Sequence, residues 1–207
     1  MSVNERYIQE LKKFLPDPQN IDDFLKYCEM PLKKSIKINL NKISLQEFED
    51  ITSKRWWRLT SSWFQEKVKD IFFIDRENID NALWRTFLHQ SWFFYIQEIA
   101  AWMPAQFLDC KEDALVLDIS AAPWWKSVQI CDYLLSQNLS KPWLVISNDV
   151  NAKRTPALAR NITRMWNHNN AITWFNGFAF GKNLWEIFDS VLVDAPCSGE
   201  WTCFKSD

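Results

Sequence analysis

Short apolar runs alternate with helical patterns through the second half of this 207-residue chain. The runs have the length of strands, and the segments between them repeat apolar residues at the spacing of an amphipathic helix. The expected strands cover 114–119, 144–147, 171–173 and 190–193, and the expected helices cover 126–135 and 157–165. Strands that alternate with helices form a parallel, doubly wound sheet with right-handed crossovers. The sequence therefore predicts an α/β fold, with strand 114–119 buried on both faces.

The first 80 residues have a different pattern and are predicted to form a small α+β domain. The expected helices here are 4–14, 21–27 and 44–51, and the expected strands are 34–39, which alternates polar and apolar residues as a half-buried strand does, and 71–74. Ser44 and Glu47 have the spacing of a capping box. We place the domain boundary between residues 80 and 81, and we expect 90–108 to be helical until Pro104 kinks or ends it.

Charge and cysteine content argue against several classes of protein. The 24 basic and 26 acidic residues give a net charge of −2, whereas nucleic-acid-binding domains are more often basic. The five cysteines form no Cys-x-x-Cys pair, and the two histidines suggest no zinc site. No apolar run reaches the ~18 residues that a membrane-spanning helix needs. We therefore expect a protein of the reducing cytoplasm, without a metal or a membrane.

The loop after strand 114–119 has the composition of a ligand-binding turn. In a doubly wound sheet, ligands bind outside the carboxyl ends of the strands. Asp118 ends this strand, and the sequence Ser-Ala-Ala-Pro-Trp-Trp-Lys follows over 120–126. Small residues allow backbone amides to approach a ligand, and the start of the next helix offers the positive end of its dipole. Two tryptophans at 124 and 125 contradict this pattern, because their indoles would block the contacts.

The content of glycine and tryptophan is inverted throughout the chain. There are 13 tryptophans and 3 glycines, although average usage would supply ~7% glycine. Tryptophan stands in the turn at 124 and 125, where a residue without Cβ is expected. We interpret many of these tryptophans as glycines written through the wrong genetic code, because UGA is read as glycine in one code and as tryptophan in another. The alternative is a protein that is truly rich in tryptophan.

Two further strand ends carry polar side chains. Asp149 follows strand 144–147 after one further residue. At the end of such a strand, an acid can accept hydrogen bonds from both hydroxyls of a ribose. A helix-capping role is the alternative for Asp149. The sequence Asp-Ala-Pro-Cys-Ser-Gly over 194–199 follows strand 190–193 and has the composition of a catalytic loop, although a single cysteine such as Cys197 is often an inert buried thiol. Because no Gly-x-Gly-x-x-Gly motif is present, S-adenosylmethionine fits better than a nicotinamide cofactor.

Taken together, these segments resemble the Sun-type (NOL/NOP/Sun, RsmB/RsmF-like) RNA cytosine-5 methyltransferases. The resemblance covers nearly the whole chain, and its most specific parts are the turn at 120–126, read as AAPGGK, and the loop at 194–199. The stretches that carry it are 31–39, 95–98, 120–126, 148–154, 159–165 and 194–199. Trp124, Trp125, Trp166 and Trp201 fall where the family has glycine, and Trp92 and Trp174 are assigned with them, whereas Trp57 is compatible with a true tryptophan.

The resemblance implies a Rossmann-like S-adenosylmethionine-binding sheet over 81–207, incomplete at its C-terminus, after an RNA-recognition module over 1–80. It assigns cofactor binding to Ser120, Ala121, Ala122, Pro123, Trp124, Trp125, Lys126, Asp149, Asn176 and Asp194, and catalysis to Asp194 and Cys197. Asn176 replaces the Asp that the family usually has near the adenine. The family's attacking thiol lies in a later motif, so Cys197 would assist product release, and the chain is expected to be an N-terminal fragment that is inactive alone.

The implied substrate is RNA, with ribosomal RNA as the family's usual target. A group of lysines in the first fifth of the chain would contact its phosphates instead of forming only a solvated face: Lys12, Lys13, Lys26, Lys33, Lys34, Lys37 and Lys42. Two other functions stay open. One is an S-adenosylmethionine methyltransferase with a different substrate, and the other is a non-catalytic RNA-binding protein whose turn is blocked by true tryptophans.

Overall fold

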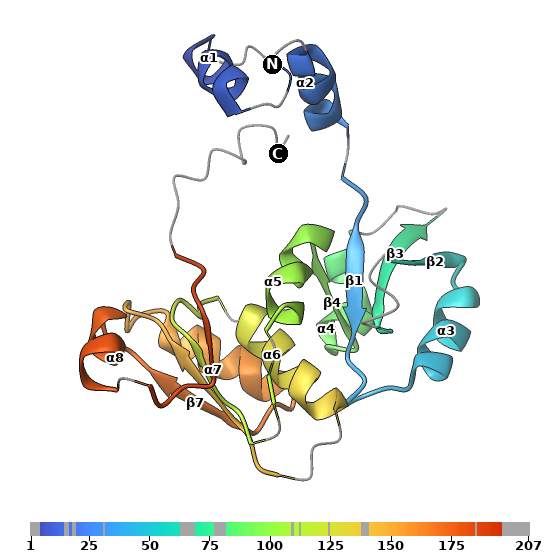
Figure 1. The fold of residues 1–207 in the computed structure, drawn as a ribbon. Coiled ribbons are helices and arrows are strands. Elements are labelled where there is room, and N and C mark those ends of the chain that lie inside the picture. Colours follow the sequence, from blue (N-terminus) through green and yellow to red (C-terminus); the bar gives the residue numbers. More distant parts are fainter. Residues whose placement is uncertain are drawn as a thin grey trace. The chain divides into compact units, whose positions relative to one another are not determined.

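The chain was analysed as a computed structural model, which describes residues 5–14, 17, 20–30, 32–62, 69–76, 82–108, 110–111, 113–123, 125–137, 141–184 and 186–195. It divides into two compact units. Helices α1 (Glu5–Phe14) and α2 (Ile21–Glu29) belong to the first unit, and residues Lys33–Pro196 form the second, which contains two four-stranded sheets (Figure 1). Among the described residues, no helix is long and apolar enough to cross a membrane.

The first sheet, sheet A, is antiparallel, with strand order β2-β3-β1-β4. Its strands are β1 (Ser35–Ile38), β2 (Trp57–Ser61), β3 (Ile71–Arg76) and β4 (Phe94–Gln97), and helix α3 (Leu45–Ser53) connects β1 to β2. The predicted capping box is confirmed, because the Ser44 side chain accepts from the Glu47 backbone N–H and the Glu47 carboxylate accepts from the Ser44 N–H. Apolar residues of the strands and α3, such as Ile36, Phe48 and Phe94, form the core of this sheet.

The prediction of a helix over 90–108 is wrong. Strand β4 occupies the middle of this segment and pairs with β1, from Ser35 opposite Gln97 to Ile38 opposite Phe94. Aromatic and β-branched residues at 94–96 favour a strand, and the pairing partner for them lies almost 60 residues earlier in the sequence, beyond the reach of local periodicity. Short helices precede and follow it: η2 (Leu83–Arg85), α4 (Phe87–Gln90), η3 (Ile99–Trp102) and α5 (Met103–Gln106). Sheet A thus draws strands from both sides of residue 80, and the division at 80/81 stays a prediction.

Strand β1 is buried along its whole length, although its alternating sequence predicts a half-buried strand. It is an inner strand of the sheet, between β3 and β4, and its Lys37 Nζ lies 2.5 Å from Asp70 Oδ2 and 2.9 Å from Asp132 Oδ2. Burial alone lowers the pKa of the Lys37 ammonium, but the two carboxylates outweigh burial and hold this pKa above its usual value. A buried lysine is stable here because both carboxylates lie within contact distance. Lys37 is therefore not part of a solvated, phosphate-contacting surface, and the expectation for it is wrong.

The second sheet, sheet B, is parallel, as predicted, with strand order β7-β6-β5-β8. Its strands are β5 (Leu115–Asp118), β6 (Leu144–Asn148), β7 (Asn170–Thr173) and β8 (Ser190–Leu192), connected by α6 (Trp125–Ser136), α7 (Thr155–Arg164) and α8 (Phe178–Asn183). Sequential strands run outward from β5 to β7, and β8 then lies on the other side of β5. The order reverses between β5 and β8, which is where such sheets bind ligands.

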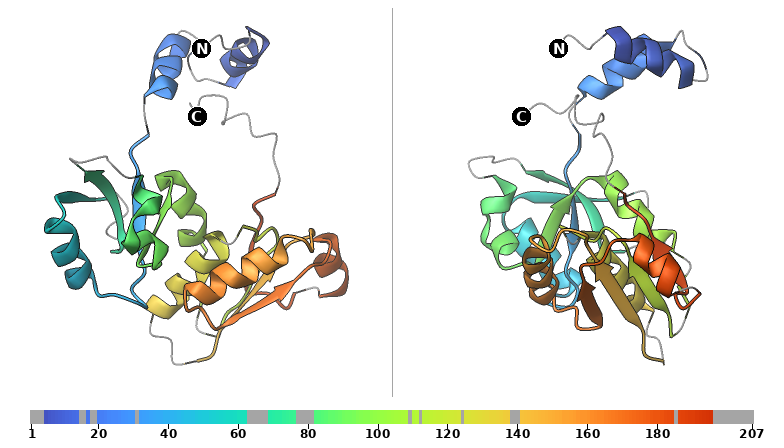
Figure 2. Two further views of the ribbon diagram at one scale, coloured as in Figure 1. Left: turned by 180° about the vertical axis from the view of Figure 1, so that it is seen from behind. Right: turned by 90° about the vertical axis from the view of Figure 1, so that its left-hand side faces the viewer.

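Helix α6 lies between the two sheets (Figures 1 and 2). One cluster of buried residues joins strands of sheet A to α6 and α7, and includes Ile71, Tyr95, Val128 and Leu158. A polar contact adds to it, since Gln129 Nε2 donates to Gln97 Oε1 at 2.7 Å. Because α6 starts at Trp125, within the segment 120–126, the same helix connects sheet A to the predicted binding edge.

Candidate functional site

Backbone and side-chain hydrogen bonds hold the predicted turn at the carboxyl edge of sheet B. The Ala121 N–H donates to the Asn148 carbonyl at 2.7 Å, and the Ala122 N–H donates to Asp149 Oδ2 at 3.2 Å. From α7 and the residue before it, Asn161 donates to the Pro123 carbonyl and Arg154 Nη2 donates to the Ala122 carbonyl. The end of β6 and the start of α7 therefore fix the conformation of the turn from two sides.

Asp149 is almost completely buried, with 3% of its surface exposed. Its Oδ2 accepts from the Ala122 N–H and lies 3.3 Å from Arg154 Nη1. Its Oδ1 accepts from the Asn151 N–H at 2.9 Å. Helix α7 begins at Thr155 with Arg154 as its N-cap residue, so the alternative that Asp149 caps this helix is wrong. The carboxylate is instead a fixed part of the turn, with lone pairs remaining for a ligand because each carboxylate oxygen can accept two hydrogen bonds.

Asp118 also lies at this edge, although it is not among the residues predicted to bind the cofactor. Its Oδ2 accepts from Ser127 Oγ at 2.7 Å, whereas its Oδ1 is buried and has no hydrogen-bond partner among the described residues. Burial is the main cause that raises its pKa from 3.8 to about 6, with a small contribution from the nearby Asp149. An unsatisfied buried carboxylate oxygen is rare in folded proteins and suits a site that receives a polar ligand. The only sequence signal for it is an acid at the end of an apolar strand.

Two predicted residues from distant loops meet at the same edge. Lys126, at the start of α6, forms an ion pair with Asp194 Oδ2 in the loop after β8. Burial lowers the pKa of the Lys126 ammonium, and the charge of Asp118 partly opposes this effect. Ser120 lies in the turn itself and is half-buried. The predicted catalytic Cys197 lies outside the described residues, as does Trp124.

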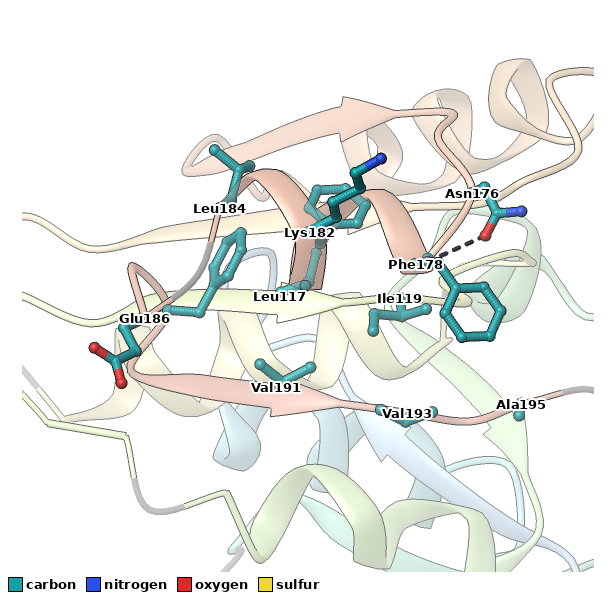
Figure 3. A pocket seen from close by; sticks show the side chains of 14 residues that line it. Leu117, Ile119, Asn176, Phe178, Lys182, Leu184, Glu186, Val191, Val193 and Ala195 are labelled. Carbon is teal, nitrogen blue, oxygen red and sulfur yellow. Dashed lines mark hydrogen bonds between the residues drawn. The ribbon is translucent and has the colours of Figure 1, made fainter.

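Asn176 lies in the loop after β7, where its side chain helps to start α8. Its Oδ1 accepts from the Phe178 N–H at 3.1 Å, which leaves the two N–H donors of its side chain and one lone pair of Oδ1 for a ligand (Figure 3). It also lines an apolar cavity of about 760 Å³ between α8 and strands β5 and β8. In Figure 3 this cavity is lined by Leu117, Ile119, Val191 and Val193 and lacks the turn and Asp149. The cavity is therefore a different site from the polar carboxyl edge of sheet B. Of the residues predicted to bind the cofactor, only Asn176 lines the cavity.

The indole of Trp125 does not block the turn. It packs into the core and stacks on Tyr95, with the ring centroids 5.3 Å apart. The expectation that both indoles of the pair obstruct the site is therefore wrong for Trp125. Two other tryptophans also fit the core as they stand, because Trp102 is fully buried and donates to Ser35 Oγ, and Trp143 is 9% exposed.

Three other tryptophans have a backbone conformation that favours glycine. Trp56, Trp92 and Trp166 have φ angles of 59°, 60° and 64°. Trp92 directly follows the C-cap residue of α4, and Trp166 directly follows the C-cap residue of α7. At α7, the Trp166 N–H donates to the Thr163 carbonyl and the next N–H donates to the Ile162 carbonyl, and α4 ends with the same pattern. This is the Schellman motif, in which the left-handed position is usually glycine.

The backbone thus supports the interpretation of Trp92 and Trp166 as glycine positions and adds Trp56 to them. Trp57 differs from these three, because its ring contacts Phe94 and Arg76 as a true tryptophan would.

Known proteins resemble this chain over nearly all of its length. The sequence profile described as 16S rRNA methyltransferase RsmB/F matches residues 105–206. The chain is 38% identical to ribosomal RNA small subunit methyltransferase F of Vibrio cholerae in an alignment that covers 99% of this chain and 42% of that protein. It belongs to the RsmB/RsmF family of Sun-type methyltransferases. The family member of Escherichia coli K12 with the same name is 36% identical over 95% of this chain and 40% of its own length. The chain thus spans about two fifths of the length of these curated relatives.

Solved structures show the same fold. A methyltransferase homologue from Pyrococcus horikoshii superposes with a TM-score of 0.74 at 24% identity, over 91% of this chain and 58% of that one. NSun6 from the same organism has a TM-score of 0.74 at 17% identity, over 92% and 70% of the two chains. The prediction of a Rossmann-like methyltransferase sheet is confirmed.

Proposed function

We propose that the protein transfers a methyl group from S-adenosylmethionine to C5 of a cytosine in RNA, with ribosomal RNA of the small subunit as the substrate. Family membership supports the reaction, since the relatives are named small-subunit ribosomal RNA methyltransferases. The observation that carries the proposal is the polar edge of sheet B, where the turn at 120–126, Asp118, Asp149 and Asp194 come together. These groups come from three strand ends at the point where the strand order reverses.

The residues at this edge fit the cofactor. The unsatisfied Oδ1 of Asp118 and the remaining lone pairs of Asp149 are acceptors for its ammonium and ribose hydroxyl groups, and the Asn176 amide is a donor for a ring nitrogen. When bound, the cofactor supplies an electrophilic methyl group on a sulfonium. Lys126 and Asp194 stand beside the turn, where Asp194 can hold the cytosine by hydrogen bonds.

Cytosine C5 becomes nucleophilic only after a thiolate has added to C6, which is covalent catalysis. The C5 proton leaves after methyl transfer, and elimination of the thiol then restores the aromatic ring. Family resemblance assigns the attacking thiol to a later motif and product release to Cys197, and both assignments stay predictions. A base inside a duplex would have to be flipped out or already be unpaired.

The surface of α7 supports RNA as the substrate. Lys153, just before this helix, and Arg160 and Arg164 within it are exposed, and none of them forms an ion pair among the described residues. No acidic residue occurs between Asp149 and Glu186. Lys42 lies in the turn between β1 and α3, where partial burial and the nearby charge of Arg164 lower the pKa of its ammonium. Neighbouring cations without carboxylates are suited to phosphate groups.

The test is release of tritium from RNA that carries [5-³H]cytidine, measured with the native protein. Methylation at C5 displaces the labelled hydrogen, so we expect S-adenosylmethionine to be required for its release. Methyl transfer to RNA without tritium release would mean a different target atom, and methyl transfer to another acceptor would mean a different substrate class. RNA binding without any methyl transfer would indicate the non-catalytic alternative. Each of these three results contradicts the proposed function.

A further inference from the structure

Asn148, at the end of β6, is fully buried and uses the complete hydrogen-bonding capacity of its side chain. Its Nδ2 donates to the carbonyl of Ile119 at 3.0 Å and to the carbonyl of Phe175 at 2.9 Å. Its Oδ1 accepts from Thr173 Oγ1 at 2.9 Å and from the Phe175 N–H at 2.8 Å. An amide has two N–H donors and two acceptor lone pairs, so all four positions are filled.

These four bonds join the ends of three neighbouring parallel strands. Ile119 follows β5 and directly precedes the turn at 120–126, whereas Thr173 ends β7 and Phe175 precedes Asn176. Asn148 itself ends β6, next to Asp149, and its backbone carbonyl accepts from Ala121. One side chain therefore lies between all three loops that the cofactor would contact, without being exposed to a ligand itself.

A second feature fixes how closely these loops approach. A Cβ atom at Gly177 would lie 2.9 Å from Ile119 Cγ2, a distance that real Cβ atoms essentially never show. Two contacts thus join the loop after β7 to the end of β5, one on each side of Asn176. Gly177 packs against Ile119, and Phe175 is linked to Ile119 through the Asn148 amide. The separation between the turn and Asn176 has little freedom as a result.

We propose that Asn148 is a positioning residue for S-adenosylmethionine, which sets the separation between the turn at 120–126 and the loop that carries Asn176. This inference rests on the proposed function, because it concerns the same cofactor. The amide is required for its chemistry and not only for its size. A carboxylate of equal shape at this position would place one oxygen, with its lone pairs, against the carbonyls of both Ile119 and Phe175, and both N–H donors would be lost.

The test compares Asn148→Asp with Asn170→Asp, and measures the dissociation constant of S-adenosylhomocysteine by isothermal titration calorimetry. Asn170 is a suitable control because it lies at the start of β7, where its Nδ2 donates to Ser147 Oγ and Cys131 Sγ, away from the three loops. We expect Asn148→Asp to weaken binding tenfold or more. Asn170→Asp should lower the thermal midpoint but leave the dissociation constant within about twofold of the wild-type value.

Acid should partly rescue Asn148→Asp. A carboxyl group buried beside two carbonyls has a raised pKa, and its protonated form regains one donor. The affinity of this variant relative to wild type should therefore rise as the pH falls from 8 to about 5.5. A side chain that only stabilised the fold would not restore binding in acid.

Thr173→Val provides a milder variant in case Asn148→Asp does not fold. It removes one donor to Asn148 Oδ1 with little change of shape, so a weakening of binding by a few-fold is expected. Unchanged affinity in both Asn148→Asp and Thr173→Val would overturn the inference, and so would equal losses in Asn148→Asp and Asn170→Asp. A wild-type protein that binds no S-adenosylhomocysteine contradicts the proposed function as well, so the two failures are distinguishable.

Discussion

Buried carboxylates occur both beneath sheet A and at the carboxyl edge of sheet B. Each place has one carboxylate oxygen without a hydrogen-bond partner in the described part of the chain, Asp70 Oδ1 and Asp118 Oδ1, but their charges are compensated to different degrees. Beneath sheet A, the charge of Lys37 contacts two carboxylates from distant segments. At the edge of sheet B, the Asp118 carboxylate accepts from the neutral Ser127 hydroxyl and forms no ion pair among the described residues. Burial raises the pKa of the Asp118 carboxyl to about 6, whereas the pKa of Lys37 is held above its usual value by its partners.

The difference separates a structural use of buried charge from a functional one. A buried charge that contacts opposite charges connects two parts of the fold, and in this chain Lys37 of β1 and Asp132 of α6 connect sheet A to the helix that starts at the turn. An ion with unused capacity destabilises the free protein and is maintained where a ligand can satisfy it. The following four substitutions test this distinction, from the largest expected effect to the smallest.

Replacing Lys37 by Met should have the largest effect on stability. It leaves Asp70 and Asp132 buried without their cation, and removal of one partner of a buried ion pair costs about 3–5 kcal/mol. We expect this loss in the free energy of unfolding measured with urea. The control, Lys33→Met, changes an exposed lysine and should stay within about 0.5 kcal/mol of wild type. Equal stability of both variants would remove the structural role of Lys37.

The pH dependence of stability should reveal Asp118. Its pKa in the folded state is about 6 against 3.8 for the free side chain, so the folded state binds the proton more tightly. Stability from this group is therefore lost as the pH rises through about 6 and is fully present below 3.8. The difference in unfolding free energy between wild type and Asp118→Asn should change in favour of wild type on acidification, by on the order of 2–3 kcal/mol.

Other carboxylates titrate in the same range, so the variant serves as the reference at every pH. Lys33→Met provides a second comparison, because it changes an exposed side chain and leaves the buried carboxylates with their partners, so its difference from wild type should stay flat over this pH range. A difference between wild type and Asp118→Asn that is flat from pH 4 to pH 8 would contradict the raised pKa of the Asp118 carboxyl.

Asp149→Asn should weaken the binding of S-adenosylhomocysteine about tenfold or more, which corresponds to ~1.4 kcal/mol. The substitution keeps one oxygen but replaces the other with an amide, which cannot accept from the Ala122 N–H or from a ribose hydroxyl. Calorimetric titration measures this loss. Asp113→Asn, at an exposed ion pair with Lys141, should bind as wild type does, and a similar loss in both variants would contradict the specific role of Asp149.

Trp166→Gly should stabilise the protein by ~1 kcal/mol, because a left-handed backbone conformation costs L-residues about 1–2 kcal/mol and glycine avoids that cost. The change lies after the last residue of α7, whereas the contacts of this segment with the turn come from Arg154 and Asn161, so it should not alter the dissociation constant of S-adenosylhomocysteine. Thermal unfolding measures the gain, and Trp57→Gly should instead lower the midpoint because it removes the contact with Phe94.

Peptide mass spectrometry of the native protein shows directly which residue stands at these positions. We expect glycine at 56, 92 and 166. Tryptophan at all three would contradict the interpretation that these codons were misread, and would leave the strained conformations as a property of the protein itself.

The strands of sheet B and the helices α6 and α7 could be predicted from the sequence, because each is a local pattern of apolar residues, whereas the short helix α8 was not predicted. The turn at 120–126, Asp149 and Asp194 could be predicted as well, since the carboxyl ends of parallel strands meet at one edge whatever the details of packing. The role of Asn148 could not be predicted in this way. A buried asparagine resembles any other in sequence, and its partners Ile119 and Phe175 lie 27 or more residues away.

The sequence by itself determined the α/β class, the family and the loops that carry polar residues, because periodicity and short motifs are properties of neighbouring residues. Tertiary structure alone decided the strand at 94–97, the burial of Lys37 and the unsatisfied oxygen of Asp118. Each of these depends on which distant segment lies opposite, and the free energy of a buried charge is set by its partners rather than by its position in the chain. The glycine preference at position 56 likewise follows from the structure, because the positive φ angle of Trp56 reveals it and the composition of the chain does not.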